Sequence, residues 1–159
     1  ILRYLRMGYL WDSVRVKGGA YGVSCRLGRS TGNFVCTSYR DPNVSGTISA
    51  YDGIADYLSG MSLNREELER AIVGAIGDLD LYMLPDARGV KSLYQYLAGD
   101  TEEKRQRMRE EMLSTTADDF RAFAGIMAEA KTHGAVSVIG GSKALDEGTR
   151  LGWKCENLF

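Results

Sequence analysis

The stretch Val14-Arg15-Val16-Lys17-Gly18-Gly19-Ala20-Tyr21-Gly22 joins an expected helix to an expected strand, and it places a cation, a glycine pair and a phenol close together. Because glycine tolerates backbone conformations and close approaches that a Cβ forbids, Gly18 and Gly19 can turn the chain and let a ligand lie against it. Arg15 and Tyr21 then offer hydrogen-bond donors on either side of the turn. The residues alone leave a second interpretation open: a helix C-cap followed by a strand, with Arg15 in solvent and Tyr21 in the core.

The segments on either side of this stretch predict a helix and a hairpin. Apolar residues at near-helical spacing predict a helix over residues 2–14. No capping residue precedes this helix and the chain begins without methionine, so we expect the chain to be part of a larger protein. Residues 21–27 and 33–39 predict two strands joined by a glycine-rich turn, which places Cys25 and Cys36 on neighbouring strands.

The rest of the chain is predicted to be mainly helical. Expected helices lie at 45–59, from Asn64 through Leu79, at 90–98 with Tyr94 and Leu97 facing inward, after Thr101, around Phe120 to Met127, and after Gly140-Gly141-Ser142. Asp41-Pro42-Asn43 predicts a turn between the second strand and the first of these helices. A third strand is expected at 135–139. This pattern predicts an α+β fold, an antiparallel-rich sheet covered by a layer of helices. Three strands alone would leave unpaired edges, so we expect residues 1–159 to form a single domain whose sheet is incomplete without upstream strands.

Composition limits the classes of partner. Twenty basic and twenty-one acidic residues among 159 give a formal charge of −1, so no nucleic-acid or membrane partner is expected. No apolar run approaches the length of a membrane span. The three cysteines, Cys25, Cys36 and Cys155, lack C-x-x-C spacing, which favours free thiols in a reducing compartment such as the cytoplasm or an organelle matrix.

Motifs for catalysis and metal binding are scarce in this sequence. His133 is the only histidine, which excludes a self-contained site that needs two imidazoles, and its place at a helix end favours a capping or exposed role. No nucleophile elbow, phosphate loop or dinucleotide fingerprint is present. Asp78, Asp80 and Asp86 lack the pattern of a calcium loop and are better explained by capping and salt bridging. We expect no catalytic residue and no metal site in this chain.

Four motifs, in order, resemble one family. They are Tyr9-Leu10-Trp11-Asp12-Ser13-Val14-Arg15-Val16-Lys17-Gly18-Gly19-Ala20-Tyr21-Gly22, Ser38-Tyr39-Arg40-Asp41-Pro42-Asn43, Ile76-Gly77-Asp78-Leu79-Asp80-Leu81-Tyr82 and Pro85-Asp86-Ala87-Arg88-Gly89. A further match is Leu113-Ser114-Thr115-Thr116-Ala117-Asp118-Asp119-Phe120. Together they resemble the C-terminal domain of the presequence protease family, within the pitrilysin and insulin-degrading class of zinc metallopeptidases.

The resemblance implies a metallopeptidase-type α/β sandwich that forms most of the last domain of a two-halved enzyme. The two halves close around an unfolded peptide, and the N-terminal half supplies zinc and a catalytic glutamate from an inverted H-x-x-E-H helix. An arginine and a tyrosine of the C-terminal half reach the substrate, and here they match Arg15 and Tyr21. Gly18 and Gly19 would keep the wall low enough for an extended peptide. Arg40 and Asp41 are interpreted as structural residues that fix the hairpin to the following helix, and a substrate contact stays open as the alternative. The fragment alone is then expected to be inactive and to bind no zinc.

Two hypotheses from other classes stay open beside this one. The chain can belong to a non-catalytic relative that serves as a scaffold or assembly subunit, or it can be a peptide-binding module. Matched substrate donors at Arg15 and Tyr21 favour the peptidase over a pure scaffold.

Overall fold

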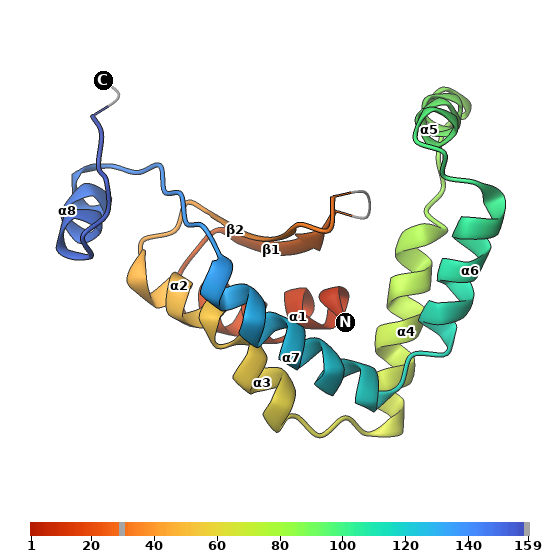
Figure 1. Ribbon diagram of the computed structural model, residues 1–159, viewed down its shortest axis with the longest axis horizontal. Helices are drawn as coiled ribbons and strands as arrows, with labels where there is room; N and C mark the ends of the chain where they lie inside the picture. Colours follow the sequence, from red (N-terminus) through yellow and green to blue (C-terminus); the bar gives the residue numbers. More distant parts are fainter. Residues whose placement is uncertain (29–30, 158–159) are drawn as a thin grey trace. The chain divides into compact units, whose positions relative to one another are not determined.

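The computed structural model describes residues 1–28 and 31–157 (Figure 1). These residues form an α+β fold, mostly helical, with one antiparallel pair of strands. The chain divides into two compact units, Ile1–Met61 with Phe120–Phe159, and Ser62–Asp119. The expectation that residues 1–159 form a single domain of a larger peptidase stays a prediction.

The first unit holds the hairpin and the helices that surround it. Its elements are α1 (Leu2–Met7), the π-helix η1 (Trp11–Lys17), β1 (Gly22–Leu27), β2 (Phe34–Tyr39), α2 (Ser45–Asp52), α3 (Ile54–Gly60), most of α7 (Ala117–His133) and α8 (Ser142–Arg150). The helix predicted at 2–14 is thus divided: α1 ends at Met7 with Gly8 as its C-cap, and the π-helix that follows ends at Lys17. The helix predicted at 45–59 is divided at Gly53, where a Cβ would lie 2.5 Å from the Tyr9 hydroxyl oxygen.

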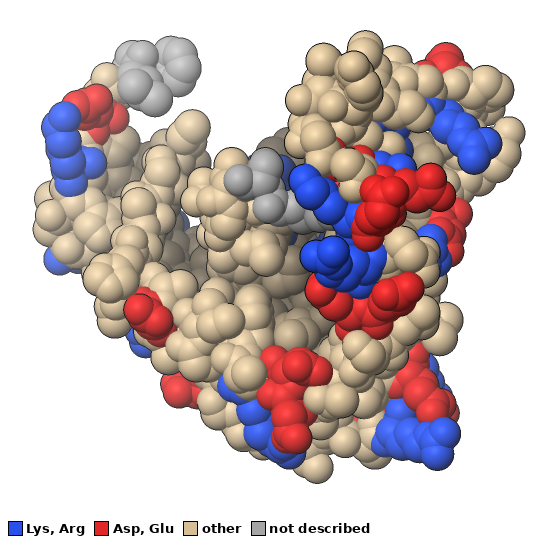
Figure 2. All heavy atoms as spheres, turned by 45° about the vertical axis from the view of Figure 1, so that its right-hand side comes forward, with Lys and Arg blue, Asp and Glu red and all other residues tan. Residues whose placement is uncertain are grey.

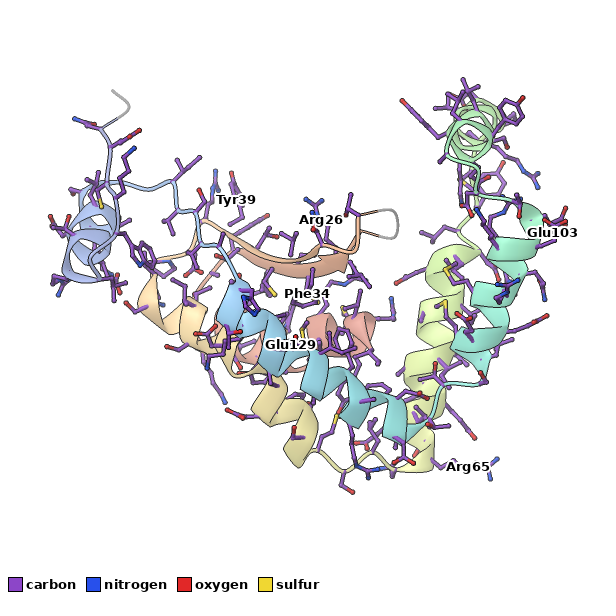
Figure 3. The ribbon with its side chains drawn as sticks, viewed as in Figure 1. Arg26, Phe34, Tyr39, Arg65, Glu103 and Glu129 are labelled. Atoms are coloured by element: carbon purple, nitrogen blue, oxygen red, sulfur yellow. The ribbon has the colours of Figure 1, made fainter. Side chains whose placement is uncertain are left out.

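The hairpin places Cys25 and Cys36 on neighbouring strands, as the sequence predicted. Cys25 lies opposite Cys36, and Gly22 opposite Tyr39, while part of the turn, residues 29 and 30, lies outside the described residues. Because side chains alternate across a strand, Cys25 and Phe34 share one face, while Arg26 and Tyr39 share the other. Figure 3 shows Phe34 on the side of α7, and Arg26 and Tyr39 on the opposite, exposed side.

The core of the first unit lies between the hairpin and the helices. Its largest fully buried side chains are Phe120, Leu5, Leu10, Ile54, Leu58 and Val14. Phe120 of α7 meets Tyr4 of α1 edge to face at 5.5 Å, and Phe123 meets Phe34 of β2 at 6.1 Å. Burial of each large apolar side chain contributes roughly 1.5–3 kcal/mol, so this contact layer holds the hairpin against α1 and α7.

The second unit consists of α4 (Arg65–Leu79), α5 (Pro85–Leu97) and α6 (Glu102–Leu113). Asn64 and Glu67 form the predicted capping box of α4, and Thr101 caps α6. Arg109 of α6 pairs with both carboxylate oxygens of Asp80, the C-cap of α4, which confirms salt bridging for that aspartate. Figure 1 shows α4 and α6 side by side and antiparallel, and the Arg109–Asp80 ion pair joins them.

Two predictions about α5 were wrong. The helix begins at Pro85 rather than at residue 90, because proline at the first helical turn is compatible with helix geometry. Tyr94 and Leu97, expected to face inward, are 69% and 70% exposed. Both residues lie on the helix, as predicted, but no described element covers their apolar side chains.

The third predicted strand was also wrong. Residues 135–141 have no regular secondary structure, and the described sheet has two strands. Val136 and Ile139 are 55% and 88% exposed. A strand forms only when a neighbour accepts its backbone hydrogen bonds, and no described segment lies beside this one as a partner.

Candidate functional site

The turn at Gly18 and Gly19 ends the π-helix and requires glycine at both positions. A Cβ on Gly18 would lie 2.5 Å from the Val14 carbonyl oxygen, and Gly19 has a φ of +78°. The backbone N–H of Ala20 donates to the Val14 carbonyl oxygen at 3.1 Å, which closes the wide turn. π-helical turns are often found at functional sites, and this one carries Arg15.

Arg15 and Tyr21 are brought together by the turn. The Arg15 Nε donates a hydrogen bond of 2.9 Å to the backbone carbonyl oxygen of Tyr21. Its guanidinium carbon also lies 4.2 Å from the centre of the Trp11 ring, a cation–π distance. Nε and the stacked plane orient the guanidinium, while its terminal nitrogens remain hydrogen-bond donors.

Tyr21 is not a core residue. Its side chain is 65% exposed, which rules out the interpretation that places the ring in the core. The ring stands edge to face with Tyr39 at 6.1 Å, and the Arg40 guanidinium lies over both rings. Trp11 and Tyr39 were not among the site residues predicted from the sequence. The strand register, which places Tyr39 opposite Gly22, was the signal that could have found Tyr39.

Asp41 has the structural role that the sequence suggested. Its carboxylate accepts from the Asn43 backbone N–H at 3.0 Å and from the Thr47 hydroxyl of α2 at 2.6 Å. The Asn43 side-chain amide donates to the Gly18 carbonyl oxygen. The turn after β2 thereby fastens the start of α2 to the Gly18-Gly19 turn.

Helix α8 also contacts the turn after β2 and the start of α2. The carboxylate of Glu147 accepts from the backbone N–H of Ser45 at 3.0 Å and also from the Ser45 hydroxyl. These hydrogen bonds lower the pKa of Glu147. The Lys143 ammonium donates to the Pro42 carbonyl oxygen at 2.9 Å.

The three cysteines are free thiols. Burial raises the pKa of Cys25, and it raises the pKa of Cys36 to about 12. Both thiols therefore stay protonated and unreactive near neutral pH, which suits a packing role.

Metal ligands do not gather in the described part of the chain. Among those residues, no group of three histidine, cysteine, aspartate or glutamate side chains could hold an ion. His133 is exposed at the last residue of α7, as its sequence position predicted. Every helix in the described ranges is too short or too polar to cross a bilayer.

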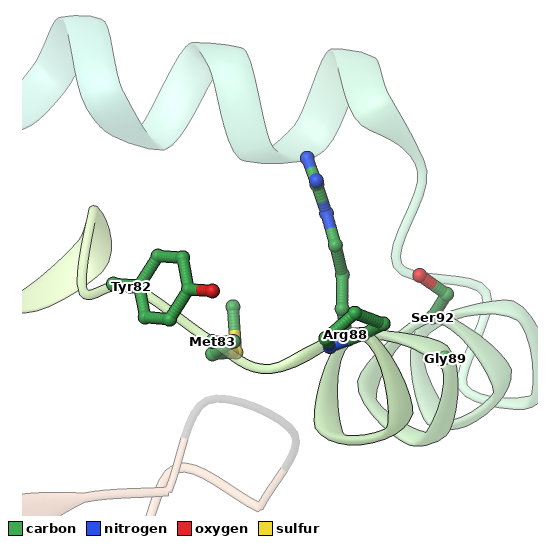
Figure 4. A pocket seen from close by; sticks show the side chains of 6 residues that line it. Tyr82, Met83, Arg88, Gly89 and Ser92 are labelled. Carbon is green, nitrogen blue, oxygen red and sulfur yellow. The ribbon is translucent and has the colours of Figure 1, made fainter.

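The second unit contains an open pocket around the loop that joins α4 to α5 (Figure 4). Its lining residues are Tyr82, Met83, Pro85, Arg88, Gly89 and Ser92. Basic and acidic side chains lie next to one another on the face shown in Figure 2. Along α4, Arg65 pairs with Glu69 and Arg70 with Glu66. The pocket lacks a cluster of titratable groups, and we assign it no role.

Comparisons with known proteins identify relatives for almost the whole chain. A family model described as the PreP C-terminal domain matches residues 1–143. Presequence protease 1, chloroplastic/mitochondrial, of Arabidopsis thaliana is 43% identical over 92% of this chain. Protein HypA of Clostridium perfringens is 33% identical over 92%, and the mitochondrial presequence protease of Emericella nidulans is 32% identical over 97%. The chain covers only 14%, 15% and 14% of the lengths of these three relatives.

Proposed function

Because this chain belongs to the family of presequence protease C-terminal domains, we propose that it is the substrate-binding and chamber-forming C-terminal part of a zinc metalloendopeptidase that degrades unfolded peptides such as presequences. Its partners are then an unfolded peptide and the N-terminal half of the same protein. The hairpin would be completed by upstream strands into the α/β sandwich of such peptidases. An organelle matrix is the proposed compartment, because two of the relatives are named as mitochondrial or chloroplastic proteins.

One observation carries the assignment of the site. Arg15 binds the backbone of Tyr21 at 2.9 Å, while the Tyr21 side chain is 65% exposed above a turn of two glycines. Two donors are therefore held together on a surface that no large side chain of residues 18 and 19 obstructs. Such a surface suits an extended peptide backbone, whose carbonyl oxygens are regularly spaced acceptors.

The chemistry assigned to these residues is stabilisation of charge on the substrate. When water attacks a peptide carbonyl, negative charge develops on the carbonyl oxygen, and a donor already in place lowers the barrier. The Tyr21 hydroxyl can donate this hydrogen bond. The free terminal nitrogens of Arg15 can hold a neighbouring carbonyl or carboxylate in a planar fork.

The described residues do not fit a zinc site, since no group of three potential ligands lies together. We therefore place no metal-dependent step on this chain. Zinc and the catalytic glutamate are proposed to belong to the N-terminal half, and Arg15, Gly18, Gly19 and Tyr21 to the substrate-binding wall opposite them.

The test is peptide binding by this chain, measured as fluorescence anisotropy of a labelled, unstructured peptide. We expect binding by the unmodified chain and weaker binding after Arg15→Gln, with Arg65→Gln of the exposed α4 surface as the matched control. Absence of binding by the unmodified chain, or equal binding by the Arg15 and Arg65 variants, would contradict the proposal. Binding without any peptidase activity in the full-length protein would favour the peptide-binding module instead.

A further inference from the structure

Arg40 has a backbone conformation that its residue type does not favour. Among the residues that the structure describes, it is the non-glycine residue with a positive φ, at 47°. For an L-residue with a side chain, this left-handed region costs free energy because the Cβ crowds the following carbonyl, whereas glycine adopts it freely. Strained backbone conformations of this kind are found most often at functional sites, so the contacts of the Arg40 side chain are of interest.

In this backbone conformation, the Arg40 side chain lies beside two exposed aromatic rings, those of Tyr21 and Tyr39. Its guanidinium carbon lies 5.8 Å from the centre of the Tyr21 ring and 5.5 Å from that of Tyr39. The rings are 65% and 60% exposed, so the three side chains form one open cluster at the end of the hairpin. Figure 3 shows Tyr39 on the side of the hairpin that faces away from α7.

The guanidinium has no acceptor among the described residues. None of the hydrogen bonds and ion pairs in that part of the chain uses it. The adjacent carboxylate, Asp41, is occupied by the Asn43 backbone and the Thr47 hydroxyl. Exposed Lys17 and half-buried Arg15 add further positive charge to the same turn region.

A planar cation flanked by aromatic faces recognises a carboxylate next to apolar groups. The guanidinium offers a bidentate fork to the two carboxylate oxygens, while the tyrosine rings contact the neighbouring apolar surface. We propose that Arg40, Tyr39 and the Tyr21 ring form a subsite for a carboxylate of the bound peptide, either an acidic side chain or the C-terminal carboxylate. This inference rests on the proposed function, because it assigns a substrate preference to the same peptide-binding surface.

The test compares matched peptides on the full chain, again by fluorescence anisotropy. An unstructured, glycine- and serine-rich peptide carries either one glutamate or one glutamine, with both ends blocked. A third version has the glutamine and a free C-terminal carboxylate. We expect the unmodified chain to prefer at least one carboxylate peptide over the blocked glutamine peptide by about fivefold or more. A preference for the glutamate peptide assigns the subsite to an acidic side chain, and a preference for the third peptide assigns it to the C-terminal carboxylate.

Arg40→Gly separates a ligand-binding role from a structural one. Glycine relieves the backbone strain and removes the guanidinium, so we expect an unchanged or higher melting temperature together with loss of the carboxylate preference. Arg40→Lys should keep part of the preference, because it keeps the charge and loses the fork. Arg26→Gln, an exposed arginine on the same side of the hairpin with ordinary backbone, is the control and should keep the full preference.

The outcomes are distinct. Equal binding of all three peptides by the unmodified chain overturns the subsite and leaves the proposed function standing. A lower melting temperature with unchanged preference in Arg40→Gly shows that Arg40 is structural and also overturns the subsite. Absence of binding by every peptide contradicts the proposed function, and the subsite with it.

Discussion

The carboxylate of Glu147 in α8 accepts a 3.0 Å hydrogen bond from the backbone N–H of Ser45, 102 residues earlier in the chain. It caps the start of α2 in place of a side chain from the preceding residue, Val44, which has no polar group to offer. The contact joins the last helix to the turn that holds Gly18. Its strength depends on the charge of a single carboxylate.

Because Glu147 accepts these hydrogen bonds as a carboxylate, we expect its contact with Ser45 to weaken in acid. Hydrogen bonds from Ser45 lower the folded-state pKa of Glu147 below its ordinary 4.5, so its stabilising contribution is present above that value and is lost as the pH falls through the folded pKa. We expect Glu147→Gln to lower the urea midpoint at neutral pH, and the difference from the unmodified chain to shrink on acidification. Glu129→Gln, at an exposed position of α7, is the control and should match the unmodified chain.

Alkaline pH tests the buried face of the hairpin. Burial raises the folded-state pKa of Cys36 from 9.0 to about 12, so the neutral thiol stabilises the fold fully below 9.0 and less as the pH rises toward 12. We expect Cys36→Ala to reduce the alkaline loss of stability, measured as the urea midpoint against pH. Cys155→Ala, at an exposed position, should leave the alkaline slope unchanged; equal slopes for the unmodified and Cys36→Ala chains would show that Cys36 does not contribute.

Tyr51→Phe is expected to keep or increase stability at neutral pH. The Tyr51 hydroxyl is buried and neither donates nor accepts a hydrogen bond among the described residues. Burial raises the pKa of Tyr51 to about 12, and the nearby Ser38 offsets part of this rise. Removal of an unsatisfied buried hydroxyl leaves the ring packing intact. Tyr96→Phe, with an 82% exposed ring, is the control, and a clear loss of stability in Tyr51→Phe alone would indicate a hydrogen bond that forms in solution.

Glycine substitutions test the turn itself. Gly19→Ala places a side chain at a φ of +78°, which should cost about 1–2 kcal/mol of unfolding free energy. Gly22→Ala has open space around its new Cβ and should change stability by less than about 0.5 kcal/mol. Chemical denaturation of both variants makes the comparison, and equal stability would mean that the turn does not need a left-handed residue.

Tyr21→Phe in the full-length protein, with its proposed peptidase activity, tests the proposed donor. The substitution removes one hydroxyl from an exposed ring, so folding stability should hardly change. If the hydroxyl stabilises the oxyanion, kcat should fall on the order of 10²-fold. Near-normal turnover in Tyr21→Phe would contradict the assignment of this residue to the site.

Arg15→Lys in the same protein should mainly lower kcat/KM, because lysine keeps the charge but loses the planar fork that positions the substrate.

The purified chain should neither retain stoichiometric zinc nor cleave unstructured peptides. We expect this because the described residues bring no three metal ligands together. Metal analysis by mass spectrometry and a quenched-peptide assay make the measurement. Cleavage that a chelator abolishes, in a sample free of other peptidases, would contradict the proposed division of labour between the two halves.

Local signals in the sequence were sufficient for much of the fold. The two-stranded hairpin, the Asp41-Pro42-Asn43 turn and the capping box at Asn64 and Glu67 depend on residues close together in the chain, and the structure confirms all three. Burial was harder to predict: an apolar stripe such as that of Tyr94 and Leu97 is exposed here, because periodicity does not say whether another element covers it. Segment 135–139 has the composition of a strand but no described partner, and strand formation is decided by the neighbour.

The sequence by itself determined which residues can form the candidate site, since Arg15, Gly18, Gly19 and Tyr21 are local and their types limit what the turn can do. Only the tertiary structure decided their surroundings. The π-helix orients Arg15 onto Trp11 and the Tyr21 backbone, the strand register brings Tyr39 to Tyr21, and Arg40 reaches both rings through a backbone conformation that no composition rule predicts for arginine. The physical reason is that hydrogen bonds and ring contacts between distant segments depend on how those segments pack, whereas turns and caps depend on neighbouring residues alone.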